Sequence, residues 1–242
     1  MKILCIIRKQ GLAAPVIALV VASVICCALI AYRIIIGCQV RHAYLVWNLF
    51  LAWLPLVFAL FALDRLNERK NSRDRKFLLL AGAWLMFFPN APYIFTDLVH
   101  VLAKGRPTFW TELMIILLAA MTGFFAGFLS LQAMHGLVAR LWGRVAGWLF
   151  VMLVSGLAAF GVYLGRFTRL NSWDVLWNPV RLLHRTGMGA WNLATEHQHA
   201  KFLILFSLFV LLGYVMLFAM TQRSAAGDDA RSLHLDGENG KS

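Results

Sequence analysis

Long apolar runs, separated by short polar segments, dominate the chain. Five of them have the roughly 20 residues that a helix needs to cross about 30 Å of hydrocarbon, and they cover residues 12–36, 43–63, 113–131, 145–164 and 202–220. A sixth run, 77–95, has no charged residue but is interrupted by Pro89, Asn90 and Pro92. This pattern predicts an all-α, polytopic transmembrane helical bundle of about six spans, with the third span broken at Pro89 and Pro92.

The composition agrees with that pattern. Of the 242 residues, 61% are hydrophobic and 14% are charged, whereas average soluble domains are about 25% charged. Because so few polar residues cannot enclose a water-soluble core, lipid must cover much of the chain. We expect one transmembrane helical domain, residues 1–221, and a disordered cytoplasmic tail, residues 222–242, which is polar and rich in Gly, Ser and Asp.

The first apolar run follows three basic residues and therefore resembles a signal peptide. The run is longer than the core of a signal peptide, however, and no Ala-x-Ala cleavage site follows it. We therefore expect it to be retained as the first span.

The distribution of Lys and Arg predicts the orientation. With the N-terminus inside, the inner segments hold 14 of the 23 Lys and Arg residues and the outer segments hold 8, while Arg33 lies in the first span. Cytoplasmic loops carry the excess of these residues, so we expect a multi-pass protein of the bacterial inner (plasma) membrane with both termini cytoplasmic. The net charge of +12 comes from these interhelical cations, and we expect no nucleic-acid binding because no soluble basic face exists.

The two prolines of the third span predict a break in the membrane. Each proline removes a backbone donor and clashes with the preceding turn, so a helix that starts at residue 77 should break near Phe88, about 18 Å along at roughly 1.5 Å per residue. We expect Asn90 to cap a second helix, whose positive end would suit an anion in the outer half of the membrane. The alternative is a plain proline kink.

A polar stripe follows the break if that second helix continues. Its members recur at spacings of three and four residues and are Asn90, Tyr93, Asp97, His100 and Lys104. Asp97 and His100 share a face close to the kink, where either can serve as a general acid or base. We therefore name Asp97 and His100 as candidate catalytic residues, and Asn90 and Tyr93 as candidate anion ligands.

A second polar cluster follows the fifth span. Arg166 and Arg169 stand three residues apart where that span ends, and such a pair suits a phosphate or a carboxylate. Asn171 is a further candidate anion ligand, and Asp174 can either hold one arginine in place or act as a catalytic acid or base. The alternative is that the arginines only anchor the helix at lipid headgroups.

The predicted topology brings the two clusters to one side of the membrane. The ends of the third and fifth spans both face outward, as does the start of the second span, which contains Asn48. Glu112, at the outer start of the fourth span, reaches the same depth. We therefore add Asn48 to the candidate anion ligands.

We expect no metal and no cofactor. His184, His197 and His199 lie on the outer side, but their spacing matches no standard metal-binding helix. The four cysteines contain no Cys-x-x-Cys pair and are interpreted as small apolar side chains.

Glycine pairs at a spacing of four residues occur three times. Such pairs let helices approach closely, so we interpret them as packing positions rather than as a site. The pairs are Gly123/Gly127, Gly143/Gly147 and Gly161/Gly165.

Two segments in order, FPNAPYIFTDLVH at 88–100 and LGRFTRLNSWD at 164–174, resemble a family of predicted bacterial membrane proteins. This family is the domain of unknown function numbered thirteen sixty-one, and the resemblance covers roughly residues 48–220. It implies a multi-span membrane protein and carries over no catalytic residue, because none is established for the family. The roles given above therefore rest on the residues alone.

Three classes of function fit these features. A non-catalytic assembly or scaffold role with a membrane protein partner is slightly favoured, because no recognised catalytic motif is present. An enzyme acting on an anionic lipid or lipid-linked substrate is the first alternative. A small transporter or flippase is the second: the broken helix favours it, but the lack of ionisable residues deep in the spans opposes it. Membrane lipids are expected partners in every case.

Overall fold

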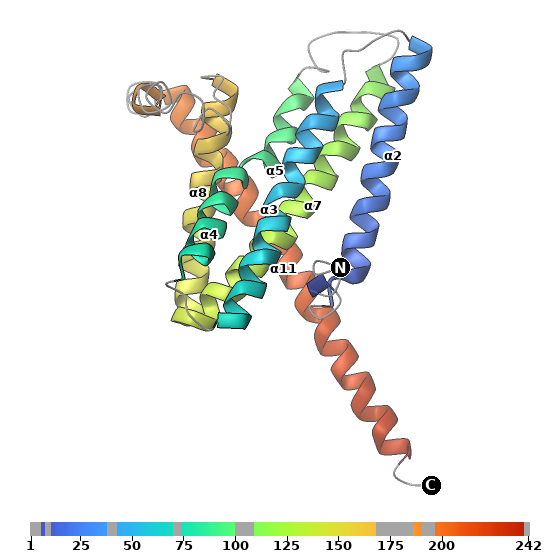
Figure 1. Cartoon of the computed structure of the whole chain (residues 1–242). Coiled ribbons are helices and arrows are strands. Elements are labelled where there is room, and N and C mark those ends of the chain that lie inside the picture. Colours follow the sequence, from blue (N-terminus) through green and yellow to red (C-terminus); the bar gives the residue numbers. More distant parts are fainter. Residues whose placement is uncertain are drawn as a thin grey trace.

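The described structure is entirely helical wherever it is regular (Figure 1). It is a computed structural model, and it describes residues 6–7, 11–37, 43–69, 74–99, 109–167, 186–189 and 197–239, with side chains up to Thr221. The elements are α2 (Ala13–Gly37), α3 (Ala43–Arg69), α4 (Arg75–Phe87), α5 (Asn90–Tyr93), the 3-10 helix η2 (Ile94–Leu98), α7 (Phe109–Trp142), α8 (Arg144–Phe167) and α11 (His197–Asn239).

Six helical stretches among the described residues are long and apolar enough to cross a membrane. The third of them, Arg75–Leu98, consists of α4, α5 and η2. The predicted all-α polytopic bundle is therefore confirmed, as is the broken third span. The helix α11 contains the sixth stretch, His197–Thr221, and continues to Asn239. The disordered tail from Gln222 stays a prediction.

The central pair of the bundle is α3 and α7, which pack along each other (Figure 1). The helix α2 packs on α7, and α8 packs on both α7 and α11. The broken span crosses between these groups: Trp84 of α4 stacks on Phe150 of α8, whereas α5 and η2 pack mainly on α7. The helix α4 itself packs mainly on α3, so the main neighbour of the third span changes from α3 before the break to α7 after it.

Two hydrophobic clusters lie on either side of the break. One contains Trp84 and Phe88, before or at the break, together with the later half of α7. The other contains Ala91 and Ile94, after the break, together with Ile30 of α2 and the first half of α7. The two parts of the broken span therefore pack in different clusters. Because Ile94 of η2 is buried in the second cluster, that cluster holds η2 in position.

Glycines of α7 and α8 make room for the break. A Cβ at Gly127 would lie 2.6 Å from Cβ of Ala91, and a Cβ at Gly161 would lie 2.6 Å from Cγ of Pro89. At Gly123 it would lie 2.9 Å from Cδ1 of Ile94. The packing role predicted for Gly123, Gly127 and Gly161 is therefore confirmed.

The third glycine pair has a different use. Gly143 adopts a φ of +90° between α7 and α8, a conformation that costs glycine little because it has no Cβ. It forms the turn between the two helices, and a Cβ there would meet nothing within 4 Å. The packing role predicted for Gly143 is therefore wrong. Its partner Gly147 does pack closely, since its Cβ would lie 2.8 Å from Cδ2 of His135.

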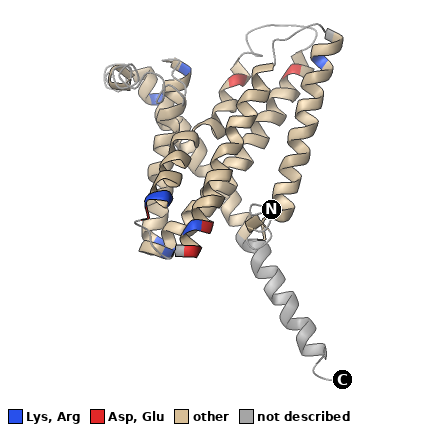
Figure 2. Ribbon diagram, in the orientation of Figure 1, with Lys and Arg blue, Asp and Glu red and all other residues tan. Residues whose placement is uncertain are grey.

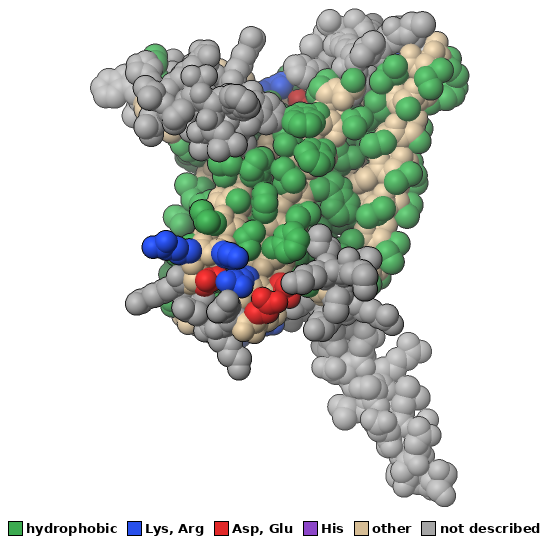
Figure 3. Space-filling view, in the orientation of Figure 1, with side chains coloured by type: hydrophobic (Ala, Val, Ile, Leu, Met, Phe, Trp, Pro, Cys, Tyr) green, Lys and Arg blue, Asp and Glu red, His purple; other side chains and the backbone are tan. Residues whose placement is uncertain are grey.

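Charged residues of the described helices gather at the two ends of the bundle (Figure 2). We call them the Asp97 end, which also carries Arg33, Glu112 and Arg166, and the Arg65 end, where Arg65 Nε donates to Asp74 Oδ2 at 2.6 Å. The start of α2 and the end of the sixth span both lie at the Arg65 end. Between the ends, apolar side chains cover the visible face (Figure 3), as contact with lipid requires.

Candidate functional site

Asp97 joins three helices at the Asp97 end. Asn48 of α3 donates from Nδ2 to Asp97 Oδ2 at 3.1 Å. Arg166 of α8 donates from Nη1 to Asp97 Oδ1, a longer contact of 3.5 Å. The carboxyl group belongs to η2, and Asp97 is only 3% exposed. A buried carboxylate needs such partners, because an isolated charge in an apolar medium is strongly destabilised.

The local sequence explains why Asp97 lies there. The helix α4 ends at Phe87, and the chain turns at Phe88 and Pro89 before α5 begins. The five residues Ile94–Leu98 then form the tighter 3-10 helix, in which Thr96 Oγ1 donates to the carbonyl of Tyr93 at 2.7 Å. The turn and the change of helix type direct Asp97 toward Asn48 and Arg166.

The cap predicted at Asn90 is wrong. Pro89, in right-handed helical conformation, precedes the first residue of α5, and Asn90 is that first residue. The Asn90 side chain instead donates backward, from Nδ2 to the carbonyl of Phe87 at 2.9 Å. The amides of Ala91 and Tyr93 donate to the carbonyls of Phe88 and Pro89. The turn continues through the prolines because the backbone stays helical there, so no new N-cap is needed.

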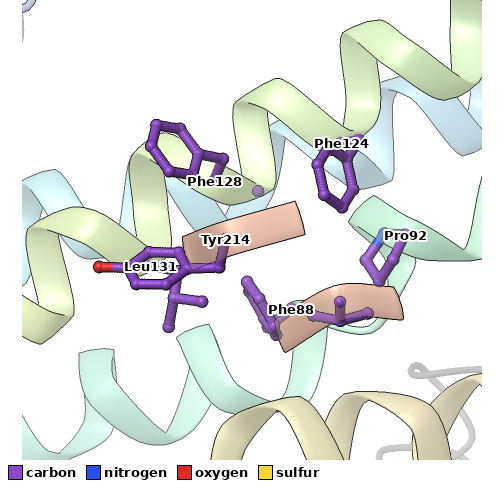
Figure 4. Close-up of a pocket in the computed structure, with 8 residues that line it drawn as sticks. Phe88, Pro92, Phe124, Phe128, Leu131 and Tyr214 are labelled. Atoms are coloured by element: carbon purple, nitrogen blue, oxygen red, sulfur yellow. The ribbon is translucent and has the colours of Figure 1, made fainter. Parts of the chain in front are cut away.

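Apolar side chains surround the break. A small void of about 10 Å³ lies beside it, lined by Phe88, Pro92, Phe124, Gly127, Phe128, Leu131, Val210 and Tyr214. Figure 4 shows the side chains that line the void, most of the labelled ones aromatic, with the Tyr214 hydroxyl directed away from Pro92. An anion would meet only hydrocarbon here. The polar groups suited to an anion lie further along the third span, at Asp97.

A second ion pair lies at the same end. Arg33 Nη2 of α2 donates to Glu112 Oε1 of α7 at 3.3 Å, and Glu112 is 4% exposed. Glu112 reaches the end of the bundle that the topology predicts, but its partner there is Arg33 rather than Arg166. The Arg33–Glu112 and Arg166–Asp97 contacts are therefore two distinct ion pairs at this end.

Arg166 also lines a large apolar groove between η2, α8 and α11. Its volume is about 580 Å³, and its lining consists of Phe95, Thr96, Val99, Arg166, Phe167, Phe202, Phe206 and Phe209. Small-molecule pockets commonly have volumes of about 300–1,000 Å³. The groove is therefore large enough for a ligand, and among the described residues that line it Arg166 is the cationic one.

The structure describes five of the nine predicted site residues. It brings Asn48, Asp97 and Arg166 together, while Asn90 lies at the break and Tyr93 is half-buried one turn before Asp97. The anion-binding roles of Asn90 and Tyr93 stay predictions. The other predicted site residues lie outside the described part of the chain and are His100, Arg169, Asn171 and Asp174.

Sequence reasoning missed the phenylalanines of the groove. Three of them, Phe202, Phe206 and Phe209, recur on α11 at spacings of four and three residues, which is the signature of one helical face. That signal was readable, but within an apolar span the side chains looked like ordinary lipid-facing residues. As for metals, no cluster of three or more His, Cys, Asp or Glu side chains occurs among the described residues.

The fold and the site define a multi-pass helical membrane protein with a buried, paired carboxylate near one end of the bundle. The chain belongs to the family described as "Protein of unknown function (DUF1361)", whose model matches residues 47–213. The matched region includes Asn48, Asp97 and Arg166, and it leaves α2 outside. No curated protein and no solved structure matches the chain.

Proposed function

We propose that this protein binds the anionic headgroup of a membrane lipid or lipid-linked molecule at Arg166. The observation that carries the proposal is the double placement of Arg166: its guanidinium contacts the buried Asp97 carboxylate and also lines the apolar groove. Asp97 and Asn48 would hold the arginine in place, and the groove would admit the ligand from the bilayer.

The guanidinium suits this role because of its geometry. It carries five N–H donors in a planar fork and stays charged at any physiological pH. The contact with Asp97 uses Nη1, and a guanidinium can donate to more than one oxygen acceptor at a time. A phosphate has the oxygen geometry that arginine binds best.

The test compares the thermal stability of the purified protein in bilayer discs of phosphatidylglycerol and of phosphatidylcholine. A ligand that binds the folded state raises its stability, so we expect the wild type to unfold at a temperature about 2–4 °C higher in the anionic lipid, corresponding to roughly 1 kcal/mol for a chain of this size. Arg166→Gln should remove this difference.

Arg33→Gln is the matched control, because Arg33 is also an ion-paired arginine at the Asp97 end. It should lower stability in both lipids and keep the difference between them. If Arg166→Gln retained the full difference, or if Arg33→Gln removed it equally, the proposed site would be wrong.

A catalytic role for Asp97 is a second candidate, favoured by its burial beside an arginine. In this version Arg166 holds the headgroup and the Asp97 carboxylate acts as a general base. Turnover of a radiolabelled anionic lipid should then vanish in Asp97→Asn, while the lipid-dependent stability persists. If the wild type converted none of a panel of anionic lipids, the catalytic role would be wrong and only the binding function would remain.

An assembly role is the other candidate. The observation that favours it is the low burial of two outer helices: only 22% of the apolar window of α2 and 11% of that of the sixth span are buried. Such faces can contact lipid or a membrane protein partner. Crosslinking in cells should then trap one partner in fixed stoichiometry, and trapping of none would count against it. No observation on the described residues favours transport specifically, since the void at the break is apolar and measures about 10 Å³.

A further inference from the structure

A continuous row of phenylalanine rings forms the wall of the groove. Phe167 meets Phe202 with ring centroids 5.3 Å apart, Phe202 meets Phe206 at 5.5 Å, and Phe206 meets Phe209 at 5.6 Å. Phe209 in turn meets Phe95 at 5.1 Å. The row therefore runs from the end of α8, along α11, to η2. Centroid distances of this size are typical of packed aromatic pairs, so the rings form a continuous apolar surface.

The polar groups of the groove are few. Thr96 already donates its hydroxyl hydrogen to the Tyr93 carbonyl at 2.7 Å, and Arg166 is the charged residue among the described residues of the lining. The groove thus combines a cation at its Asp97 end with an extended hydrocarbon surface. Its chemical complement is a molecule with an anionic head and an apolar chain.

Several described side chains in and beside the groove are exposed. Val99 is 57% exposed, Phe167 47% and Phe209 39%, and the neighbouring face of α11 exposes Leu205 and Leu212. In a membrane-spanning bundle these side chains face the bilayer. A lipid can therefore reach the groove sideways, without crossing an aqueous phase.

We propose that the groove binds the acyl chain of an anionic phospholipid of the surrounding bilayer, with its phosphate at Arg166. This inference rests on the proposed function and names its ligand class. The acyl chain lies against the rings of Phe202, Phe206 and Phe209, and the phosphate lies beside the contact between Arg166 and Asp97. Charge complementarity fixes which end of the lipid points toward the Asp97 end of the bundle.

The experiment is native mass spectrometry of the full-length protein after removal of endogenous lipid. Three lipids are added in turn: long-chain phosphatidylglycerol, short-chain phosphatidylglycerol, and phosphatidylcholine with the same long chains. We expect the wild type to retain long-chain phosphatidylglycerol about tenfold better than either of the others, where tenfold corresponds to 1.4 kcal/mol.

Val99→Trp tests the groove, because a larger side chain at this lining position fills part of its volume. It should reduce binding of long-chain phosphatidylglycerol to the level of the short-chain lipid, while phosphatidylglycerol stays preferred over phosphatidylcholine. Val24→Trp is the matched control: Val24 is 62% exposed, on α2, and does not line the groove. It should bind all three lipids as the wild type does.

The two proposals fail in different ways. A full preference for long chains in Val99→Trp would overturn the acyl-chain site and leave headgroup binding intact. Equal retention of the two long-chain lipids by the wild type would overturn headgroup recognition instead. If a polyisoprenyl phosphate displaced phosphatidylglycerol completely at equal concentration, the ligand would be an isoprenoid lipid, and the assignment to a bilayer phospholipid would be wrong.

Discussion

Pro89 occupies the space in which a side chain at Gly161 would begin. A Cβ on Gly161 would lie 2.6 Å from Cγ and 2.8 Å from Cβ of the proline ring, distances shorter than any ordinary contact between carbon atoms. On the opposite side of the broken span, Gly127 allows the same approach by Ala91. The break is therefore held between α7 and α8 by two glycines.

This packing predicts that Gly127→Ala is destabilising. The added methyl group would lie 2.6 Å from Ala91 Cβ, and backbone must shift to relieve the contact. Overpacking of this kind costs about 1–3 kcal/mol. Gly136→Ala on the same helix is the control, because its Cβ would meet nothing within 4 Å. Unfolding in mild detergent measures both, and equal stability of the two variants would contradict the packing.

The contacts of Asp97 predict strong coupling with Arg166. Arg166→Gln removes one partner of a buried charge, which costs about 3–5 kcal/mol when no other group compensates. Asp97→Asn in the same chain removes the charge itself, so the double variant should be more stable than Arg166→Gln alone. A double-mutant cycle on unfolding free energies measures this coupling, and simple additivity would show that the two side chains act independently.

The hydrogen bond between His135 of α7 and Tyr214 of α11 should stabilise the packing of the sixth span on α7. The Tyr214 hydroxyl lies 2.7 Å from Nδ1 of His135, and both residues are buried. Tyr214→Phe leaves that nitrogen without its partner, at a cost of about 1–3 kcal/mol. Tyr32→Phe, at an exposed position of α2, should have little effect. Thermal unfolding measures the stability of both variants. If Tyr214→Phe were as stable as the wild type, this role of the hydrogen bond would be contradicted.

The arrangement of the charged ends predicts which residues an impermeant thiol reagent reaches in intact cells. In a cysteine-free background, Trp110→Cys lies at the Asp97 end, and Val145→Cys lies at the Arg65 end; both positions are at least 70% exposed. With cytoplasmic termini, as the positive residues indicate, Trp110→Cys is labelled and Val145→Cys is labelled only after lysis. The reverse labelling pattern would show that the protein has the opposite orientation in the membrane.

The spans could be predicted well from the sequence because the thickness of the hydrocarbon core sets the length of the apolar run that a spanning helix needs. Each apolar run of sufficient length became a helix, and two prolines were enough to locate the break at Phe88 and Pro89. Asn48 and Asp97 are 49 positions apart, yet topology alone placed them at one depth and on one side. In a membrane protein, the order of the spans along the sequence gives the depth and the side of the membrane at which each residue lies. A soluble fold has no comparable constraint.

The local details were less predictable. The cap at Asn90 was wrong because Pro89 is also compatible with helical φ and ψ, so the turn continued where a cap was expected. The pairing of Glu112 with Arg33 depends on how α2 packs against α7, which no local pattern encodes. The groove escaped notice because Phe202, Phe206 and Phe209 have the same hydropathy whether they face lipid or a ligand.

The Arg33–Glu112 pair has a consequence for the boundaries of the family. Arg33 belongs to α2, which precedes the matched region, whereas Glu112 belongs to α7, which lies within it. A chain cut back to the matched residues would carry a carboxylate deprived of this cation at membrane depth, where ionised groups are costly. The helix α2 therefore supplies a counterion to Glu112 from outside the matched region, and a chain cut back to residues 47–213 should be less stable than the full chain.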